Sequence, residues 1–459
     1  MFDGKPVTVV GLGVSGLSAA RLLKGQGVQV KLTDNGASPE LAQRKRELEA
    51  LGIECELGGH TEAFLDGTGI LVVSPGVGDD SLPLKWARER GVPVMGEVEL
   101  GYRFSKGTII AISGTNGKST VTSILGEIFK RSGKKTFVCG NIGLPLTSIA
   151  PDTDQDSVIV LEISSFQLAR IDTFRPAVAI MLNITEDHLD RYSDFAGYEN
   201  AKLRIFANQT DSDHAILNYD QTRFKTIKSS LKAKAFYFSK HRLPKEFEGA
   251  YIENEELVVR KGGKYIWIAS KDSLSLTGEH NLENALAASL PPFVLGVDPE
   301  IIKAVLYNFK TLNHRFEMVD TVGGVKFIDD SKATNIDSAR KAIQSSPKWI
   351  ILIAGGKDKG GDYRVIAKLI KDKVKSIFLI GEAKERIAKA FSGLIPISFS
   401  ETLEAAVNSA YGSARNGDTV LLSPMCSSFD MFKDYKERGD VFRRAVSDIK
   451  SKPKQKKNA

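Results

Sequence analysis

Short apolar runs alternate with helical patterns along most of the chain. Apolar runs bounded by turn-forming residues predict buried strands, and apolar residues spaced at helical intervals between them predict helices. In the first hundred residues strands are expected at 7–11, 28–33, 70–74 and 92–94, with helices at 15–25 and 39–51. Near the other end strands are expected at 325–329, 349–354, 376–380 and 419–423. The alternation predicts an α/β protein with an open, Rossmann-like sheet at each end.

The middle of the chain follows the same plan and then becomes β-rich. Strands are expected at 108–112, 157–163, 178–182 and 215–218, followed by a β-rich stretch at 235–270 and a helix near Asn281. At roughly 100–200 residues per domain, a chain of 459 residues suggests about three domains. We expect an N-terminal Rossmann-like domain at 1–96, a central domain with a mostly parallel sheet at 97–311, a C-terminal Rossmann-like domain at 312–449 and a basic tail at 450–459.

The formal charge of +7 is concentrated in the tail. The last ten residues hold five lysines and no acid, so the remainder carries 7 − 5 = +2. A nearly neutral body does not indicate nucleic-acid binding, and the tail is expected to be disordered. Three cysteines without CxxC spacing favour reduced thiols. Because no apolar run approaches a membrane span and no signal peptide is evident, we expect a cytoplasmic protein. We also expect it to act as a monomer.

A glycine loop with the sequence GTNGKST lies at residues 114–120, between the apolar run 108–112 and a helical pattern at 121–130. Backbone N–H groups of such a loop converge on phosphate oxygens, while Lys118 can reach the β- and γ-phosphates and Ser119 can bind Mg²⁺. The loop is shorter than the common phosphate-loop pattern, because only Thr115 and Asn116 separate its first glycine from the Gly117-Lys118 pair. The sequence predicts ATP or GTP binding; the alternative is an ordinary turn that caps a helix.

A second glycine pattern, GLGVSG at residues 11–16, follows the first expected strand, and Asp34 ends the next. This arrangement is typical of dinucleotide sites, in which glycines allow close approach of a diphosphate and the acid binds a ribose. It fits an NAD-dependent oxidoreductase, but a UDP-sugar meets the same physical requirements. A turn without any ligand is the third alternative.

Acids and one histidine follow strands of the central domain. Glu162 ends a strand, where an acid can hold Mg²⁺ beside a phosphate loop. His188 comes directly after Glu186 and Asp187, which favours a metal or substrate ligand, although lone histidines are more often structural. Lys202 lies in a helical pattern, and the residues alone favour an ordinary exposed lysine.

Further candidates lie in the last third of the chain. Asn281 and Asn284 share one helix face and can read an adenine edge or cap the helix. Arg315 and Asp330 suit triphosphate and ribose contacts from a second domain. The loops 354–362 and 422–430 follow strands, at the sheet edge where α/β proteins bind ligands. A lysine in one loop and paired serines in the other suit a small carboxylate substrate; solvated surface loops are the alternative.

The chain, apart from its tail, resembles the Mur ligases, which use ATP to add amino acids to the UDP-muramoyl precursor of peptidoglycan. The matching strings, in the family's order, are GLGVSGLSAA, VVSPG, GTNGKST, GNIG, LEISSFQL, NITEDHLDRY, YENAKLRIF, HNLENALAA, NHRFE, DDSKATN, GGKDKGGD and SPMCSSFDMFKDYKERG. The chain is most similar to the members that add D-glutamate to UDP-N-acetylmuramoyl-L-alanine through an acyl phosphate. The short phosphate loop is also typical of this family.

The resemblance implies a role for each candidate. The catalytic residues are Lys118, Glu162, His188 and Lys202. The ATP-binding residues are Gly114, Thr115, Asn116, Gly117, Lys118, Ser119, Thr120, Asn281, Asn284, Arg315 and Asp330. The UDP-substrate residues are Val14, Ser15, Asp34, Ser74, Asn141 and Gln167, and the D-glutamate residues are Lys359, Ser428 and Tyr435. One or two Mg²⁺ ions are implied at Ser119, Glu162, His188 and Lys202, with Lys202 carbamylated by CO₂ so that a cation that would repel the metal becomes a carboxylate.

Some positions depart from the family's pattern. Asn35 and Gly36 stand where some relatives have a hydroxyl and an arginine, and Tyr435 replaces a phenylalanine. The string DNPR, typical of the ligase that adds the diamino acid, is absent, which favours glutamate addition. Folylpolyglutamate synthases share the ligase core and remain an alternative, as do other Mur-type ligases. A nucleotide-driven nucleic-acid protein with a basic tail is the alternative from another class.

Overall fold

The computed structural model describes residues 2, 4–188, 191–192, 194–276, 278–310 and 313–451. The chain forms two compact units, one of Met1–Ile184, Glu199–Ser275 and Asn281–Phe309, the other of Thr185–Tyr198, Leu276–His280 and Lys310–Ala459. The first unit contains two sheets and the second unit one, so the expected three-domain α/β class is confirmed. The expected boundary at 311–312 and tail residues 452–459 lie outside the described residues.

The N-terminal sheet is parallel throughout, in the order β3-β2-β1-β4-β5. Its strands are β1 (Val7–Val10), β2 (Val30–Asp34), β3 (Glu54–Leu57), β4 (Ile70–Val73) and β5 (Val94–Gly96). Its helices are α1 (Val14–Gly25), α2 (Pro39–Glu49), α3 (Leu82–Glu89) and α4 (Glu97–Phe104). Buried aliphatic residues form one cluster beneath α1, α2 and α4 and another beneath α3, so apolar strands are covered on both faces.

The central sheet has nine strands in the order β14-β13-β12-β11-β10-β9-β6-β8-β7. They are β6 (Thr108–Ser113), β7 (Thr136–Gly140), β8 (Val158–Glu162), β9 (Val178–Met181), β10 (His214–Asn218), β11 (Lys234–Ser239), β12 (Gly249–Glu253), β13 (Glu256–Lys261) and β14 (Lys264–Ser270). Only the pairs β12–β13 and β13–β14 are antiparallel. The mostly parallel sheet and the β-rich stretch are therefore as expected.

In the central part of the chain, the described residues form seven α-helices that follow the strands. They are α5 (Lys118–Arg131), α6 (Leu146–Ile149), α7 (Ser165–Leu168), α8 (Phe195–Leu203), α9 (Thr222–Thr226), α10 (Glu279–Val294) and α11 (Pro299–Asn308). Helix α5 packs on β7 and β8 and contacts α11. Because β6 runs directly into α5, the glycine loop at 114–117 lies at the carboxyl end of a central parallel strand.

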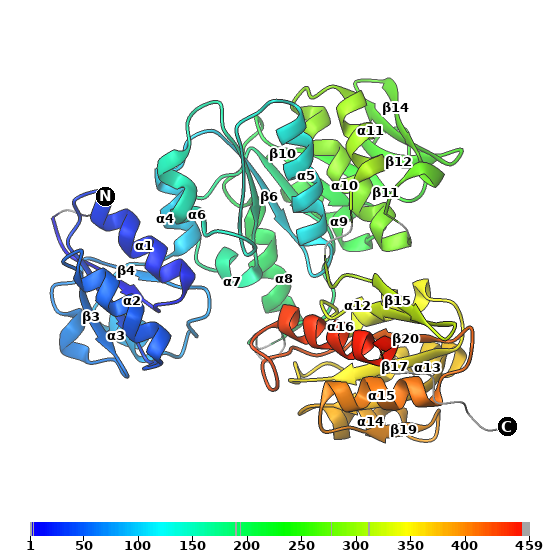
Figure 1. Cartoon of the computed structure of the whole chain (residues 1–459). Helices are drawn as coiled ribbons and strands as arrows, with labels where there is room; N and C mark the ends of the chain where they lie inside the picture. The colour runs from blue at the N-terminus through cyan, green and yellow to red at the C-terminus, as the bar shows by residue number, and fades with distance from the viewer. Residues whose placement is uncertain are drawn as a thin grey trace. The chain divides into compact units, whose positions relative to one another are not determined.

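The third sheet lies in the second unit, in the order β15-β16-β20-β17-β18-β19. Its strands are β15 (Glu317–Val322), β16 (Val325–Asp329), β17 (Ile350–Gly355), β18 (Val374–Ile380), β19 (Ile397–Phe399) and β20 (Thr419–Leu422), and only β15 is antiparallel. Its helices are α12 (Ile336–Ser345), α13 (Ala367–Lys373), α14 (Lys384–Phe391), α15 (Leu403–Ser413) and α16 (Tyr435–Ser451). One apolar core packs α12, α13 and α14 on the sheet and a second packs α15 and α16, so both faces are covered (Figure 1).

Helix α16 ends at Ser451, so two residues of the expected tail continue this helix. In the described part of the chain no helix is long and apolar enough to cross a membrane.

Candidate functional site

The glycine loop in the first unit has the backbone that a phosphate site requires. Gly117 directly precedes α5 with a φ of 88°, a left-handed conformation that glycine adopts without strain. A Cβ on Gly117 would lie 2.3 Å from Asn284 Oδ1, so the loop also packs too closely for a side chain. The N-terminal amides of α5 therefore stand at the end of a loop whose course depends on glycine.

Asn183, to which the sequence motifs assign no individual role, holds the middle of this loop. Its side-chain oxygen accepts the Asn116 N–H at 2.8 Å, and its amide donates to the Asn116 carbonyl at 3.0 Å. Its own carbonyl accepts the Thr115 N–H at 2.8 Å. The available signal was an amide placed directly after β9, because β9 pairs with β6 and must end beside the loop.

Two lysine side chains converge on one carbonyl of the loop. Lys118 Nζ donates to Gly114 O at 2.9 Å and to Thr115 O at 3.0 Å, and Lys202 Nζ donates to Gly114 O at 2.8 Å. Lys202 is only 2% exposed, so its interpretation as an ordinary exposed helix lysine is wrong. A buried ammonium beside a second one is costly, and such positions are typically functional. The side chains of Ser119 and Thr120 are buried at the start of α5.

Glu162 ends β8, which pairs with β6 so that Glu162 lies opposite Ile112, close to where the loop begins. Asn141 Nδ2 donates to Glu162 Oε1 at 2.7 Å, which fixes the carboxylate, while the buried Oε2 has no hydrogen-bond partner. A buried, unsatisfied carboxylate oxygen is costly unless it binds a ligand. Among the residues that the structure describes, no cluster of three histidine, cysteine or acidic side chains could hold a metal alone. One carboxylate beside a hydroxyl and a phosphate loop nevertheless fits Mg²⁺, which keeps waters and phosphate oxygens as its other ligands.

The amides of α10 stand beside the same loop. Asn284 Nδ2 donates to Asn281 Oδ1 at 3.2 Å, so the two residues share a helix face as expected. The close approach of Asn284 to Gly117 places this face at the end of the phosphate loop. Loop, Glu162, Lys202 and both amides are thus brought together within one unit.

The glycines of the turn at 11–16 serve two different purposes. Gly11 has a φ of 95°, and a Cβ on Gly16 would lie 1.7 Å from the Gly11 carbonyl oxygen. Ser74 Oγ donates to that carbonyl at 3.2 Å. A Cβ on Gly13, by contrast, would meet nothing within 4 Å. Gly11 and Gly16 are therefore required by the turn itself, while Gly13 leaves its backbone open to a ligand.

The other residues expected at the UDP-substrate site differ in their solvent exposure and in their hydrogen bonds within the protein. Asp34 accepts the backbone N–H of Leu12 at 2.5 Å and that of Gly36 at 2.7 Å, so it stabilises the glycine turn. Val14 is 56% exposed at the start of α1. The Gln167 side-chain oxygen accepts the Ser164 N–H at 2.9 Å in a capping box of α7, which commits that oxygen to the helix.

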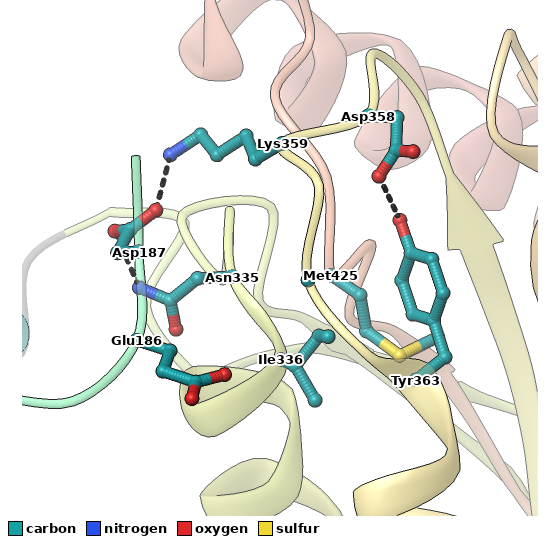
Figure 2. A pocket seen from close by; sticks show the side chains of 9 residues that line it. Glu186, Asp187, Asn335, Ile336, Asp358, Lys359, Tyr363 and Met425 are labelled. Carbon is teal, nitrogen blue, oxygen red and sulfur yellow. Dashed lines mark hydrogen bonds and ion pairs between the residues drawn. The ribbon is translucent and has the colours of Figure 1, made fainter. Parts of the chain in front are cut away.

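The second unit contains a pocket lined by Glu186, Asp187, Asn335, Ile336, Asp358, Lys359, Gly361, Tyr363 and Met425 (Figure 2). Lys359 Nζ lies 3.1 Å from Asp187 Oδ1, and Asn335 Nδ2 donates to Asp187 Oδ2 at 3.0 Å. Burial alone would raise the pKa of Asp187, but Lys359, His188 and the Asn335 hydrogen bond lower it to about 2. Lys359 is therefore held by a fixed anion. The sequence predicts a substrate contact for Lys359 but no individual role for Asp187 or Asn335.

His188 adopts a φ of 57°, and its Nε2 lies 3.8 Å from Asp187 Oδ2. Its ring centroid is 6.2 Å from that of Tyr198. Ser428 is buried in the loop after β20. Tyr435 begins α16, with Lys332 Nζ 4.0 Å from its ring centroid and its carbonyl accepting from Ser331 Oγ at 2.7 Å.

Asp330 is buried next to the segment that carries Arg315. It accepts the Phe316 N–H at 3.1 Å and the Ser423 hydroxyl at 3.1 Å. Burial raises its pKa to about 7, although these bonds and Arg315 act in the opposite direction. An acid kept at such a cost to its ionised form is typical of a functional site.

Comparison with known proteins agrees with this layout. Residues 5–96 match the family model of the Mur ligase MurD-like N-terminal domain, residues 112–290 the Mur ligase middle domain, and residues 314–426 the Mur ligase glutamate ligase domain. The UDP-N-acetylmuramoylalanine–D-glutamate ligase of Thermoanaerobacter sp. (strain X514) is 43% identical over 453 residues, covering 97% of this chain and 99% of the relative. The chain belongs to the Mur ligase family.

Other relatives give the same result for this Mur ligase. The enzyme of the same name from Acidobacterium capsulatum is 44% identical and covers 96% of both chains. Among solved structures, UDP-N-acetylmuramate-alanine ligase from Thermotoga maritima has a TM-score of 0.60 at 20% identity, covering 97% of this chain and all of that one. A pseudomurein peptide ligase from Methanothermus fervidus has a TM-score of 0.61 at 20% identity and similar coverage. At that identity these two structures show the fold alone.

Proposed function

We propose that this Mur ligase joins D-glutamate to UDP-N-acetylmuramoyl-L-alanine at the expense of ATP, in the synthesis of peptidoglycan precursor. The observation that carries the proposal is similarity of 43–44% over nearly the whole chain to ligases of that name. The phosphate loop with its unsatisfied Glu162 oxygen supports the ATP-dependent part. The dinucleotide-type glycine turn serves a UDP-sugar in this reading, not a nicotinamide cofactor.

Loop amides and Lys118 hold the ATP phosphates, and Glu162 with Ser119 holds Mg²⁺, which supplies charge neutralisation at the phosphates when bound. An oxygen of the L-alanyl carboxylate attacks the γ-phosphorus of ATP, the bond from that phosphorus to the bridging oxygen breaks, ADP leaves, and the carboxylate becomes an acyl phosphate. The neutral D-glutamate amine then attacks its carbonyl carbon to form a tetrahedral intermediate, the amine loses a proton, phosphate leaves, and an amide bond remains. Fixed N–H groups and a lysine suit charge that develops on phosphate oxygens, and exclusion of water protects the acyl phosphate.

The assignment of the remaining residues is part of the proposal. The neutral amine of Lys202 adds CO₂ and releases a proton to form a carbamate, which with His188 would complete the metal sites. The nucleotide is contacted by Asn281, Asn284, Arg315 and Asp330. The UDP-muramoyl substrate is contacted by Val14, Ser15, Asp34, Ser74, Asn141 and Gln167. The D-glutamate is contacted by Lys359, Ser428 and Tyr435. The enzyme acts as a monomer in the cytoplasm, with domains at 1–96, 97–311 and 312–449.

The deciding experiment measures phosphate release from ATP by the purified protein with Mg²⁺ and UDP-N-acetylmuramoyl-L-alanine. D-glutamate, L-glutamate and other amino acids are compared, and the product is weighed by mass spectrometry. We expect release that requires D-glutamate and a product heavier by one glutamyl unit. Phosphate release without the muramoyl substrate, or faster release with another amino acid than with D-glutamate, would move the assignment to another Mur-type or folylpolyglutamate-type ligase. Binding of NAD(H) would instead favour an oxidoreductase.

A further inference from the structure

Two loops of the second unit, after β17 and after β20, are bonded to each other. We call residues 355–362 the lysine loop and residues 423–430 the serine loop. The Lys357 N–H donates to the Ser427 carbonyl at 2.9 Å, and the Ser427 N–H donates to the Lys357 carbonyl at 3.1 Å. This reciprocal pair of backbone bonds fixes the distance between the two loops at Lys357, which directly precedes Asp358 and Lys359.

The hydroxyl of Tyr363 joins the same loops through side chains. It donates to Asp358 Oδ1 at 2.8 Å and lies 3.2 Å from Cys426 Sγ, while the whole residue is 3% exposed. An ionised carboxylate only accepts, so the single hydroxyl hydrogen goes to Asp358 and the Cys426 thiol donates to the tyrosine oxygen. Burial raises the pKa of Cys426 to about 12, which keeps that thiol hydrogen in place.

Arg386 of α14 binds the other oxygen of Asp358. Its guanidinium pairs with Asp358 Oδ2 and also donates to the carbonyls of Gly360 at 3.1 Å and Gly361 at 2.9 Å. The guanidinium lies 5.7 Å from the centroid of the Tyr363 ring. Burial would raise the pKa of Asp358, but the hydrogen bonds from Tyr363 and Arg386 lower it. Both carboxylate oxygens are therefore engaged.

The consequence concerns Lys359, the neighbour of Asp358 in the sequence. An unengaged Asp358 would offer its anion to the adjacent ammonium and draw the lysine back onto its own loop. With Asp358 bound by Tyr363 and Arg386, the Lys359 side chain extends the other way and meets Asp187 across the pocket, as Figure 2 shows. Its side chain is 16% exposed, so an anion that enters the pocket can reach it.

We infer that Tyr363 and Arg386 are positioning residues for the amino-acid substrate: by engaging Asp358 they present the Lys359 ammonium to a carboxylate of D-glutamate. The inference rests on the proposed function and deepens it. It adds to the residues that contact D-glutamate two residues that act only through Lys359, and it predicts an effect confined to one of the three substrates.

The test is the change of Tyr363 to phenylalanine in the full chain, which removes one hydroxyl and keeps the ring. Hydrogen bonds to charged groups are among the stronger ones. We expect KM for D-glutamate to rise about tenfold, equal to about 1.4 kcal/mol, while KM for ATP and for the muramoyl substrate and kcat stay within twofold. Tyr411→Phe is the matched control, because that ring packs on Phe327 at the opposite face of the sheet, and all its constants should stay within twofold.

Arg386 provides a second, independent variant. Arg386→Gln should raise KM for D-glutamate at least as much as Tyr363→Phe, and Arg386→Lys, which keeps a cation near Asp358, should recover part of the loss. An unchanged KM for D-glutamate in both Tyr363→Phe and Arg386→Gln would overturn the inference, as would equal loss for all three substrates. Wild-type turnover with D-glutamate, measured in the same series, separates failure of the inference from failure of the proposed function.

Discussion

The ammonium group of Lys202 is buried next to a second positive charge. It shares the Gly114 carbonyl with the ammonium of Lys118. Conversion to a carbamate replaces one of two neighbouring cations by an anion beside the loop that receives ATP and Mg²⁺. We predict that Lys202→Ala lowers turnover more than about 100-fold, which requires a loss of about 2.7 kcal/mol or more in transition-state stabilisation.

The modification itself has a direct readout. Wild-type protein equilibrated with ¹³C-labelled bicarbonate should show a carbamate carbon signal that is absent from Lys202→Ala. Lys303→Ala, at a partly exposed position of α11, is the control and should keep both the signal and the turnover. A wild type without the signal, or an active Lys202→Ala, would remove the carbamate from the mechanism.

Asp330 predicts a dependence of stability on pH. Its pKa is raised to about 7 in the folded chain, whereas an unfolded aspartate titrates near 4. Between these values the folded form keeps a proton that the unfolded form has lost, so the free energy of unfolding falls as pH rises from about 4 to 7. Asp330→Asn removes this titration. We therefore predict that the free energy of unfolding of Asp330→Asn, compared with that of the wild type, is higher at pH 8 than at pH 5, by an amount on the order of 2–4 kcal/mol.

Melting temperatures of wild type and Asp330→Asn at pH 5 and pH 8 check this prediction. Asp372→Asn, at an exposed position of α13, is the control and should follow the wild type at both pH values. If the melting temperatures of wild type and Asp330→Asn changed equally with pH, ionisation of Asp330 would not destabilise the folded protein.

What could be predicted at individual positions depended on the distance between partners along the chain. Lys118 and Ser119 follow from a local loop, and Glu162 from its place at a strand end. Asn183 supports Asn116 from 67 positions away, and Asp187 meets Lys359 across 172. Such pairs depend on tertiary packing that local pattern does not encode. The burial of Lys202 has the same origin, which is why a helical pattern alone gave the wrong environment.

At the level of elements, the strands that the pattern located are mainly the interior ones. Strands β1, β6, β8, β9 and β17 are buried along their length and read as continuous apolar runs. The strands that the pattern did not locate are β3, β7, β15 and β19, and each lies at the edge of its sheet. Most residues of these edge strands are partly or fully exposed, so the strands carry fewer apolar residues and give a weaker signal.

The glycine turn between β1 and α1 gives a prediction that separates folding from binding. Gly16→Ala would press a methyl group against the Gly11 carbonyl, so we expect it to destabilise the protein by at least about 2 kcal/mol. Gly13→Ala puts its methyl group into open space, at a residue whose φ of −68° suits any amino acid. It should lower stability by about 1 kcal/mol or less.

Although Gly13→Ala should change stability little, it should weaken binding of the muramoyl substrate. A methyl group in the space left for the diphosphate should raise KM for UDP-N-acetylmuramoyl-L-alanine at least fivefold, equal to about 1 kcal/mol, and leave KM for ATP unchanged. Thermal melts and steady-state kinetics of both variants provide the check. A Gly13→Ala protein with normal KM for the muramoyl substrate would place the diphosphate elsewhere.

For the whole molecule, the net charge raises the question whether the basic tail belongs to the activity. Helix α16 continues to Ser451, and Lys450 Nζ pairs with Asp320 Oδ2 at 2.7 Å, so the first lysine of the tail is part of the fold. Removal of residues 452–459 takes away four lysines and lowers the formal charge from +7 to +3, that is 7 − 4. We predict that this truncation changes kcat and all three KM values by less than twofold.

The same truncation decides between a ligase and a nucleic-acid-driven ATPase. Attraction of a short lysine-rich tail to RNA is electrostatic and weakens with salt, whereas amide-bond formation needs only the folded domains. ATP turnover at low salt should therefore be the same with and without added RNA, in the full chain and in the chain that ends at Ser451. RNA-stimulated turnover that disappears with the tail would contradict this and assign the lysines a role in activity.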